Sequence, residues 1–218
     1  MGPGGYPLGV VGESGQEGIL GSSGVGTGSI VTAQKGSGSG TEPLVFGMVL
    51  FLSSEAMFFG ALLSAYYYLR SGAASWPPPA IRVEPVEPAI ATLILLASSG
   101  TVTLAERAAA NADARRLRSW IATTIALGAI FVASQVRTWL TDAFGIRSSA
   151  YGTIVYAMTG FHVMHVVAGL GLFISVLASA SGAAARGERS PALTAATYYW
   201  HFVDIVWIAL FSTIYLVR

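Results

Sequence analysis

Five ionisable side chains interrupt the long apolar stretches of this 218-residue sequence. They are Glu55, His162, His165, His201 and Asp204. A carboxyl or imidazole group among apolar residues costs free energy unless it is paired, is protonated or faces a polar cavity. Such groups can join helices by hydrogen bonds, hold a proton or bind a metal ion. The partners of these five groups therefore decide which chemistry the chain supports.

The spacing of these residues predicts that they meet at one depth. His162 and His165 are three residues apart, which places both rings on one face of a helix. His201 and Asp204 repeat that spacing in the last apolar stretch. Glu55, within LFLSSEAMFFGALL, is about twelve residues into its own stretch, or ~18 Å along a helix. We expect Glu55 to accept hydrogen bonds from one or more histidines or to stay protonated, and Asp204 to be held by His201 or a neighbour.

The three histidines also permit other classes of function. With two carboxylates they could ligate zinc or non-haem iron, and histidines from two helices could ligate a haem. A self-contained membrane haem or metal protein that uses His162, His165 and His201 is therefore the alternative to a hydrogen-bonded clasp between helices. No repeated Glu-x-x-His motif supports metal ligation. A small proton-coupled transporter is disfavoured because neither an internal repeat nor paired broken helices are visible.

Composition indicates a membrane protein. Hydrophobic residues make up 53% of the sequence and charged residues 11%, against about 25% charged in ordinary soluble domains. The net charge of +1 and the scattered arginines disfavour nucleic acid as a partner. The sequence has no cysteine, which excludes disulfides and thiolate metal sites.

The apolar stretches predict an all-α, polytopic membrane helix bundle. Five of them approach or exceed the ~20 residues that cross a bilayer. Their predicted limits are 43–69, 86–105, 119–140, 151–180 and 191–217. Residues 1–42 are rich in glycine and serine and are predicted to form a flexible N-terminal tail. The bundle is expected to occupy residues 43–218.

Small and aromatic residues add two predictions. Gly160, Gly169 and Gly171 suggest a close contact between helices. Aromatic runs lie near the ends of two stretches, and we expect them to form belts at the membrane surface. These belt residues are Tyr66, Tyr67, Tyr68, Trp76, Tyr198, Tyr199 and Trp200.

Lysines and arginines in the connections predict the orientation. Seven lie on the side of the N-terminus: Lys35, Arg107, Arg115, Arg116, Arg118, Arg186 and Arg189. Five lie on the other side: Arg70, Arg82, Arg137, Arg147 and Arg218. We therefore expect a cytoplasmic N-terminus and an external C-terminus, in the plasma membrane of a prokaryote.

Three sequence stretches together resemble one known family. GMVLFLSSEAMFFGALLSAYYY, YGTIVYAMTGFHVMHVVAGLGLF and YYWHFVDIVWIALF occur in this order on separate predicted helices. In this combination the chain resembles subunit III of the haem-copper cytochrome oxidases, from about residue 47 to residue 218. Its five spans are similar to the shorter form of that subunit, which lacks two helices of longer relatives.

The resemblance implies an accessory subunit of a terminal oxidase that reduces oxygen to water. Such a subunit has no catalytic residues and no metal of its own, because the haems and copper belong to partner subunits. The implied partners are the catalytic subunit I, subunit II and phospholipid held in a cleft. The implied roles are stabilising the oxidase during turnover and supporting proton uptake.

The same resemblance implies roles for individual residues. Glu55 corresponds to the family's intramembrane, carbodiimide-reactive carboxylate, and His162, His165, His201 and Asp204 fall on matching motif positions. Phospholipid headgroups are expected near Arg70, Arg186 and Trp76.

Overall fold

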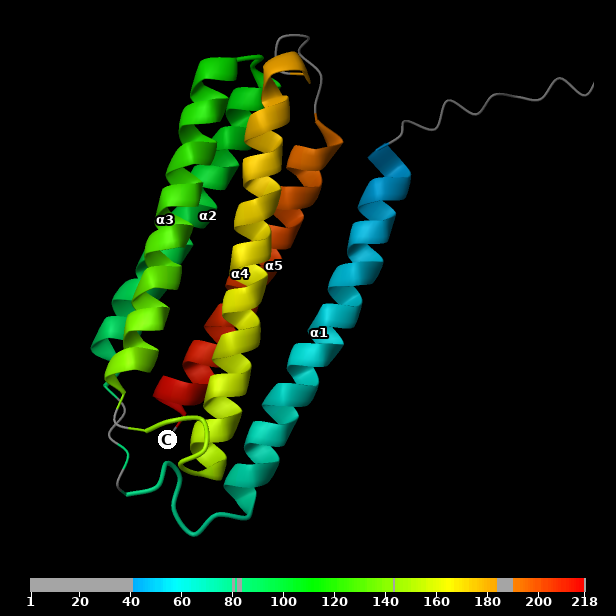
Figure 1. Ribbon diagram of the computed structural model, residues 1–218. Helices are drawn as coiled ribbons and strands as arrows, with labels where there is room; N and C mark the ends of the chain where they lie inside the picture. The colour runs from blue at the N-terminus through cyan, green and yellow to red at the C-terminus, as the bar shows by residue number, and fades with distance from the viewer. Residues whose placement is uncertain (1–40, 80, 82–83, 143, 184–189, 218) are drawn as a thin grey trace, which may run out of the picture. The chain divides into compact units, whose positions relative to one another are not determined.

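The computed structural model describes residues 41–79, 81, 84–142, 144–183 and 190–217. They form α1 (Thr41–Ser71), α2 (Val86–Ala110), α3 (Ala114–Thr141), α4 (Ala150–Ala183), α5 (Pro191–Phe211) and a π-helical turn η2 (Ser212–Leu216). No strand occurs in these residues (Figure 1). Five helices are long and apolar enough to cross a membrane, at 45–71, 86–110, 114–141, 150–178 and 191–216. The predicted all-α bundle with five spans is confirmed, whereas residues 1–40 of the predicted tail lie outside the described residues.

The connection between the second and third spans is shorter than predicted. α2 continues five residues past the predicted end at 105, and α3 begins five residues before the predicted start at 119. The Asp113 side chain caps α3 by accepting the backbone N–H of Arg116 at 3.0 Å. Ala112 turns the chain with a φ of 54°, in the left-handed region. The charged segments that read as a loop therefore extend two helices and leave a tight turn between them.

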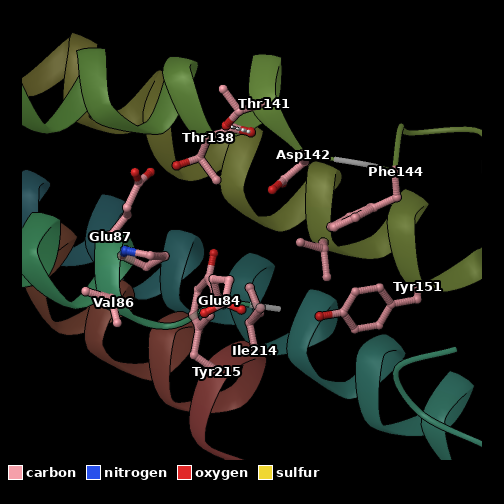
Figure 2. Close-up of a pocket in the computed structure, with 12 residues that line it drawn as sticks. Glu84, Val86, Glu87, Thr138, Thr141, Asp142, Phe144, Tyr151, Ile214 and Tyr215 are labelled. Carbon is pink, nitrogen blue, oxygen red and sulfur yellow. Dashed lines mark hydrogen bonds between the residues drawn. The ribbon is translucent and has the colours of Figure 1, made fainter. Parts of the chain in front are cut away.

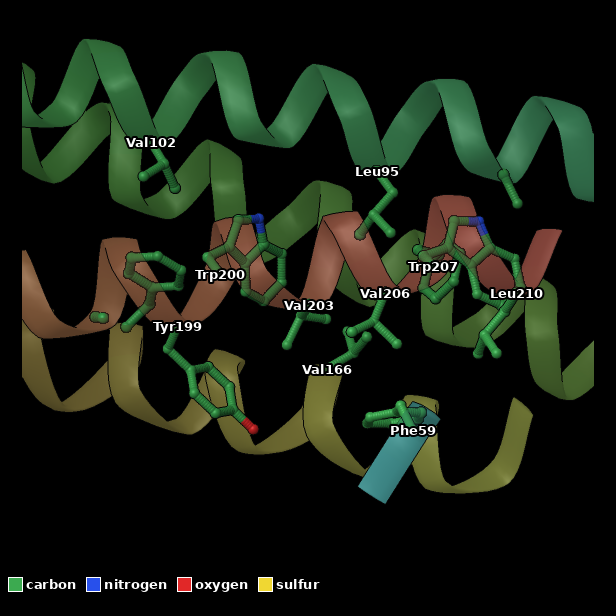
Figure 3. Packing of buried hydrophobic residues seen from close by; sticks show 14 of the residues in the cluster. Phe59, Leu95, Val102, Val166, Tyr199, Trp200, Val203, Val206, Trp207 and Leu210 are labelled. Atoms are coloured by element: carbon green, nitrogen blue, oxygen red, sulfur yellow. The ribbon is translucent and has the colours of Figure 1, made fainter. Parts of the chain in front are cut away.

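Trp200 holds the four helices α2 to α5 together. Its side chain is fully buried, and its indole N–H donates to the Ser98 hydroxyl of α2 at 2.9 Å. A Cβ atom added at Gly128 of α3 would lie 2.8 Å from its ring, and one at Gly169 of α4 would lie 2.9 Å from it. The ring thus fills space that two glycines leave open. Figure 3 shows Trp200 and Trp207 projecting from α5 toward α2.

The predictions for aromatic residues and glycines need correction. Tyr66, Tyr199 and Trp200 are buried between helices, with 1%, 4% and 0% of their surface exposed, so the belt prediction was wrong for them. Their rings are large enough to span the distance between helices, and packing there removes more apolar surface from the membrane boundary. A Cβ at Gly160 or Gly171 would meet no atom within 4 Å, so the close contact predicted for three glycines holds only at Gly169.

α1 joins the bundle through its contacts with α4 and α5. Only Phe59 and Tyr66 are buried among its described side chains. Near its C-terminal end, the Arg70 guanidinium donates to the Val217 carbonyl at 3.0 Å. α1 is therefore attached by its two buried aromatic side chains together with partly buried apolar side chains such as Leu52, Leu62 and Leu69.

Candidate functional site

An ion-pair contact between Glu55 and His165 links α1 to α4. His165 Nε2 lies 3.0 Å from Glu55 Oε2. The His165 side chain is 9% exposed and the Glu55 side chain 21% exposed. Because the pair lies within two spanning helices, each group supplies the polar partner that the membrane interior cannot. Glu55 thus meets one of the histidines among which its partner was expected.

The hydrogen bond made by the second ring nitrogen of His165 determines where the pair can hold a proton. Nδ1–H donates to the Phe161 carbonyl at 2.7 Å, so Nε2 is free to share a proton with Glu55. Either Nε2–H donates to the ionised carboxylate, or a protonated carboxyl donates to the Nε2 lone pair. Both arrangements hold one proton between the two side chains. The contact can therefore move a proton between two atoms without breaking.

Aromatic rings enclose the pair. The Phe59 ring meets the His165 ring edge-on at a centroid distance of 5.2 Å, and the Tyr199 ring lies parallel to it at 6.5 Å. The Tyr199 hydroxyl also donates to the His165 backbone carbonyl at 3.1 Å. These contacts from α1 and α5 restrict the imidazole orientation, so the pair is held at the junction of three helices.

Asp204 and His201 meet at a residue that sequence reasoning missed. The Ser99 hydroxyl of α2 hydrogen-bonds to Asp204 Oδ2, and it lies 3.0 Å from His201 Nδ1. With the hydroxyl proton donated to the carboxylate, Nδ1–H of His201 donates to the Ser99 oxygen. Serine is frequent in membrane helices, so nothing in its spacing distinguished Ser99. This chain of hydrogen bonds joins α2 to α5.

His162 occupies a third place, apart from both groups. It is fully buried, and Nε2–H donates to the Val203 backbone carbonyl of α5 at 3.2 Å. Its ring lies 5.8 Å from the Phe131 ring and 4.8 Å from the Trp207 ring, measured between centroids. The five candidate residues are therefore divided among three contacts between helices. Within the residues that the structure describes, no three His, Asp or Glu side chains form a group able to hold a metal ion.

The three residues expected near lipid have different surroundings. Arg70 contacts the Val217 carbonyl, as described above. The Trp76 ring packs edge-on against Tyr66 and Tyr151, at centroid distances of 5.3 and 5.1 Å. Arg186 lies outside the described residues.

A polar pocket with a volume of about 490 Å³ lies where α2 begins and α3 ends (Figure 2). We call it the mouth pocket. Its lining residues are Glu84, Val86, Glu87, Pro88, Thr138, Thr141, Asp142, Phe144, Tyr151, Val155, Ile214 and Tyr215. Sequence reasoning missed it because its acidic residues come from two connections far apart in the chain.

Burial raises the pKa of the Asp142 carboxyl above its usual 3.8, and the negative charge of Glu87 adds to the rise. A carboxyl whose pKa is raised by folding leaves stability unchanged below its usual pKa and lowers stability as the pH rises from that value through the raised pKa of the folded state. We therefore expect Asp142→Asn to raise the thermal unfolding midpoint of the isolated chain at pH 7 and to leave it unchanged near pH 3. The gain is at most about 1 kcal/mol because the group is half-exposed. Glu106→Gln, at the opposite end of α2, is the control, and an equal gain at both pH values would contradict the assignment.

Comparison with known proteins identifies a family. The family model described as cytochrome c oxidase subunit III matches residues 32–217. A "Cytochrome c oxidase subunit 3" from Thermostichus vulcanus is 38% identical over 173 residues, which cover 79% of this chain and 86% of the relative. A "Probable cytochrome c oxidase subunit 3" from Mycobacterium bovis is 39% identical over 201 residues, which cover 90% and 99%. A relative of the same name as the first, from Synechocystis sp., is 37% identical over 174 residues, which cover 79% and 75%.

The match to the family model extends over all of the described helices. Together with five helices able to cross a membrane, the bacterial relatives indicate a multi-pass protein of the plasma membrane. The chain belongs to the cytochrome c oxidase subunit III family, as an accessory, non-redox subunit of a haem-copper respiratory oxidase.

Proposed function

We propose that this chain stabilises a haem-copper oxidase by holding α1 against α4 through the Glu55–His165 contact. The observation that carries the proposal is the 3.0 Å contact between an acidic and a basic side chain within two spanning helices. Apolar side chains of α1 also pack against the bundle, and this pair adds a polar attachment within the membrane. Because the Glu55 carboxyl can gain or lose a proton while it stays beside His165, the pair also buffers protons and supports proton uptake by the complex.

The partners follow from the family. A subunit III works beside subunits I and II of its oxidase, which carry the haems and copper. We propose that the N-terminus is cytoplasmic and the C-terminus external, on the distribution of lysines and arginines described above. The exposed apolar side chains of α1, such as Met57 at 77% and Phe46 at 66%, support contact with phospholipid. Arg70, Arg186 and Trp76 remain the proposed headgroup contacts.

The test is purification of the complex from native membranes in mild detergent, through a tag at the C-terminus of this chain. We expect haem and copper to co-purify and the eluate to consume oxygen. A chain that emerges without an oxidase would contradict the proposed function. A chain that carries its own haem spectrum after separation from the other subunits would favour the haem-protein alternative.

The Glu55→Gln oxidase tests the role of the pair during turnover. The amide still hydrogen-bonds to His165, so we expect assembly and the initial oxygen-consumption rate to stay close to those of the unaltered oxidase. The amide cannot take up a proton, so we expect a turnover lifetime several-fold shorter, measured as total oxygen consumed before inactivation. Glu106→Gln is the matched control. An unchanged lifetime for Glu55→Gln would remove proton exchange from the proposal.

A further inference from the structure

The mouth pocket lies at one end of the helix bundle and is not a groove along its side. Its lining comes from the first turn of α2, the last turn of α3, the first turns of α4 and the turn η2 that follows α5. Glu84, Asp142 and Phe144 lie beyond the spans themselves. Four chain segments therefore surround one polar cavity at the membrane boundary, on the same side as the C-terminus (Figures 1 and 2). A protein segment lying across the helix ends can reach this cavity.

The lining of the pocket is acidic. Three carboxylates line it, Glu84, Glu87 and Asp142, and among the described lining residues there is no lysine or arginine. Arg137 of α3 pairs with Glu87, at 3.1 Å between Nη2 and Oε1. Among the described residues that leaves two carboxylates without an ion-pair partner. Burial and the negative charge of Glu87 raise the pKa of Asp142.

Tyr215 provides a second, independent sign of a ligand. Its side chain is only 8% exposed, yet its hydroxyl has no hydrogen-bond partner among the described residues. It lies in the π-helical turn η2, a geometry frequent at functional sites. Figure 2 shows its ring among the acidic residues that line the pocket. The hydroxyl oxygen is not sealed from the pocket, so a ligand there can hydrogen-bond to it.

The chemistry of the lining selects the ligand. Three carboxylates do not come close enough together to hold a metal ion in the described part of the chain. The volume of about 490 Å³ accommodates a charged group together with its aliphatic stem. Aromatic rings of Phe144, Tyr151 and Tyr215 line the same cavity and can face a cation. Carboxylates, a hydroxyl and aromatic walls are the partners of an organic cation.

We propose that the mouth pocket binds a basic side chain, lysine or arginine, from another subunit of the oxidase. This inference rests on the proposed function, because it needs the assembled complex. The basic side chain balances Glu84 and Asp142 and hydrogen-bonds to Tyr215. The contact fixes the external face of the four-helix unit α2 to α5 to its neighbour, at a site separate from the Glu55–His165 pair.

Photo-crosslinking in the purified complex tests this contact. Benzoylphenylalanine is introduced at Thr141, which lines the pocket, or at Leu140, which is 81% exposed and does not line it. Each version is also made with Glu84→Gln and Asp142→Asn together. After irradiation, joined peptides are identified by mass spectrometry. We expect the Thr141 probe to join a lysine- or arginine-containing segment of another oxidase subunit.

The controls separate the possible outcomes. The yield of that product is expected to fall about fivefold or more in the double variant or in high salt, since both weaken charge pairing. The Leu140 probe is expected not to join the same segment. Products with phospholipid or with this chain alone, or a yield indifferent to the double variant, would overturn the inference. If no oxidase co-purifies, the proposed function itself fails, whereas an intact complex without the product refutes this contact only.

Discussion

Trp200→Ala is expected to lower the free energy of unfolding by about 3–5 kcal/mol, the range for removing a large buried aromatic side chain. The ring has no exposed surface and contacts α3 and α4 where Gly128 and Gly169 leave room for it. Its loss leaves a cavity that glycine backbones cannot fill. It also removes the hydrogen bond to the Ser98 hydroxyl of α2. A single substitution on α5 therefore disturbs three other helices.

Unfolding of the isolated chain in mixed detergent micelles measures this effect. Tyr198→Ala is the matched control, because Tyr198 is on the same helix, close to Trp200, and is 52% exposed. We expect that control to shift the unfolding midpoint little. Equal midpoints for the two variants would show that Trp200 does not hold the helices together. Trp200→Phe, which keeps part of the ring volume, is expected to fall between them.

His165→Leu is expected to have the second largest effect, a loss of about 3 kcal/mol, because it leaves the Glu55 carboxyl within the membrane without its partner. The leucine also loses the hydrogen bond to the Phe161 carbonyl. Adding Glu55→Leu removes the stranded carboxyl, so the double variant is expected to be more stable than His165→Leu alone. This reversal would not occur if the two residues acted independently.

A double-mutant cycle on the isolated chain measures the coupling. Unfolding free energies of both single variants and the double variant are compared with that of the unaltered chain. A coupling energy within about 0.5 kcal/mol of zero would mean that the contact contributes nothing to holding α1. His201→Leu serves as the comparison, since its partner Ser99 lies on α2 and does not involve α1.

Much of the fold could be predicted from hydrophobicity alone. Five apolar stretches are sufficient to identify five spans, because no water is available in the membrane to satisfy an unpaired backbone. Hydrophobicity does not predict where a helix ends once it has left the membrane and is surrounded by water. Residues 106–110 and 114–118 carry charges and therefore look like a loop, although the structure makes them helical. Asp113 was the residue in the sequence that indicated the start of α3, since aspartate is preferred immediately before a helix.

The residues of the candidate site could be predicted from the sequence, but which of them pair with one another could not. Depth and helical spacing drew attention to Glu55 and His165, and the structure brings them within hydrogen-bond distance. Which histidine meets which carboxylate depends on the rotation of each helix about its axis. Packing residues such as Trp200 and Gly128 determine that rotation, and their contacts join distant parts of the sequence. The rotation of α2 likewise brings Ser99 to Asp204 and His201, which the sequence did not indicate.

The partners Glu55 and His165 are also separated in time. They are 110 positions apart in the chain, so at ribosomal speeds roughly 5 to 20 s pass between their synthesis. Throughout that interval the nascent α1 carries a carboxyl whose partner does not yet exist. It must remain protonated or stay beside the insertion machinery until α4 arrives. The first helix to be made is thus among the last to find its partner in the bundle.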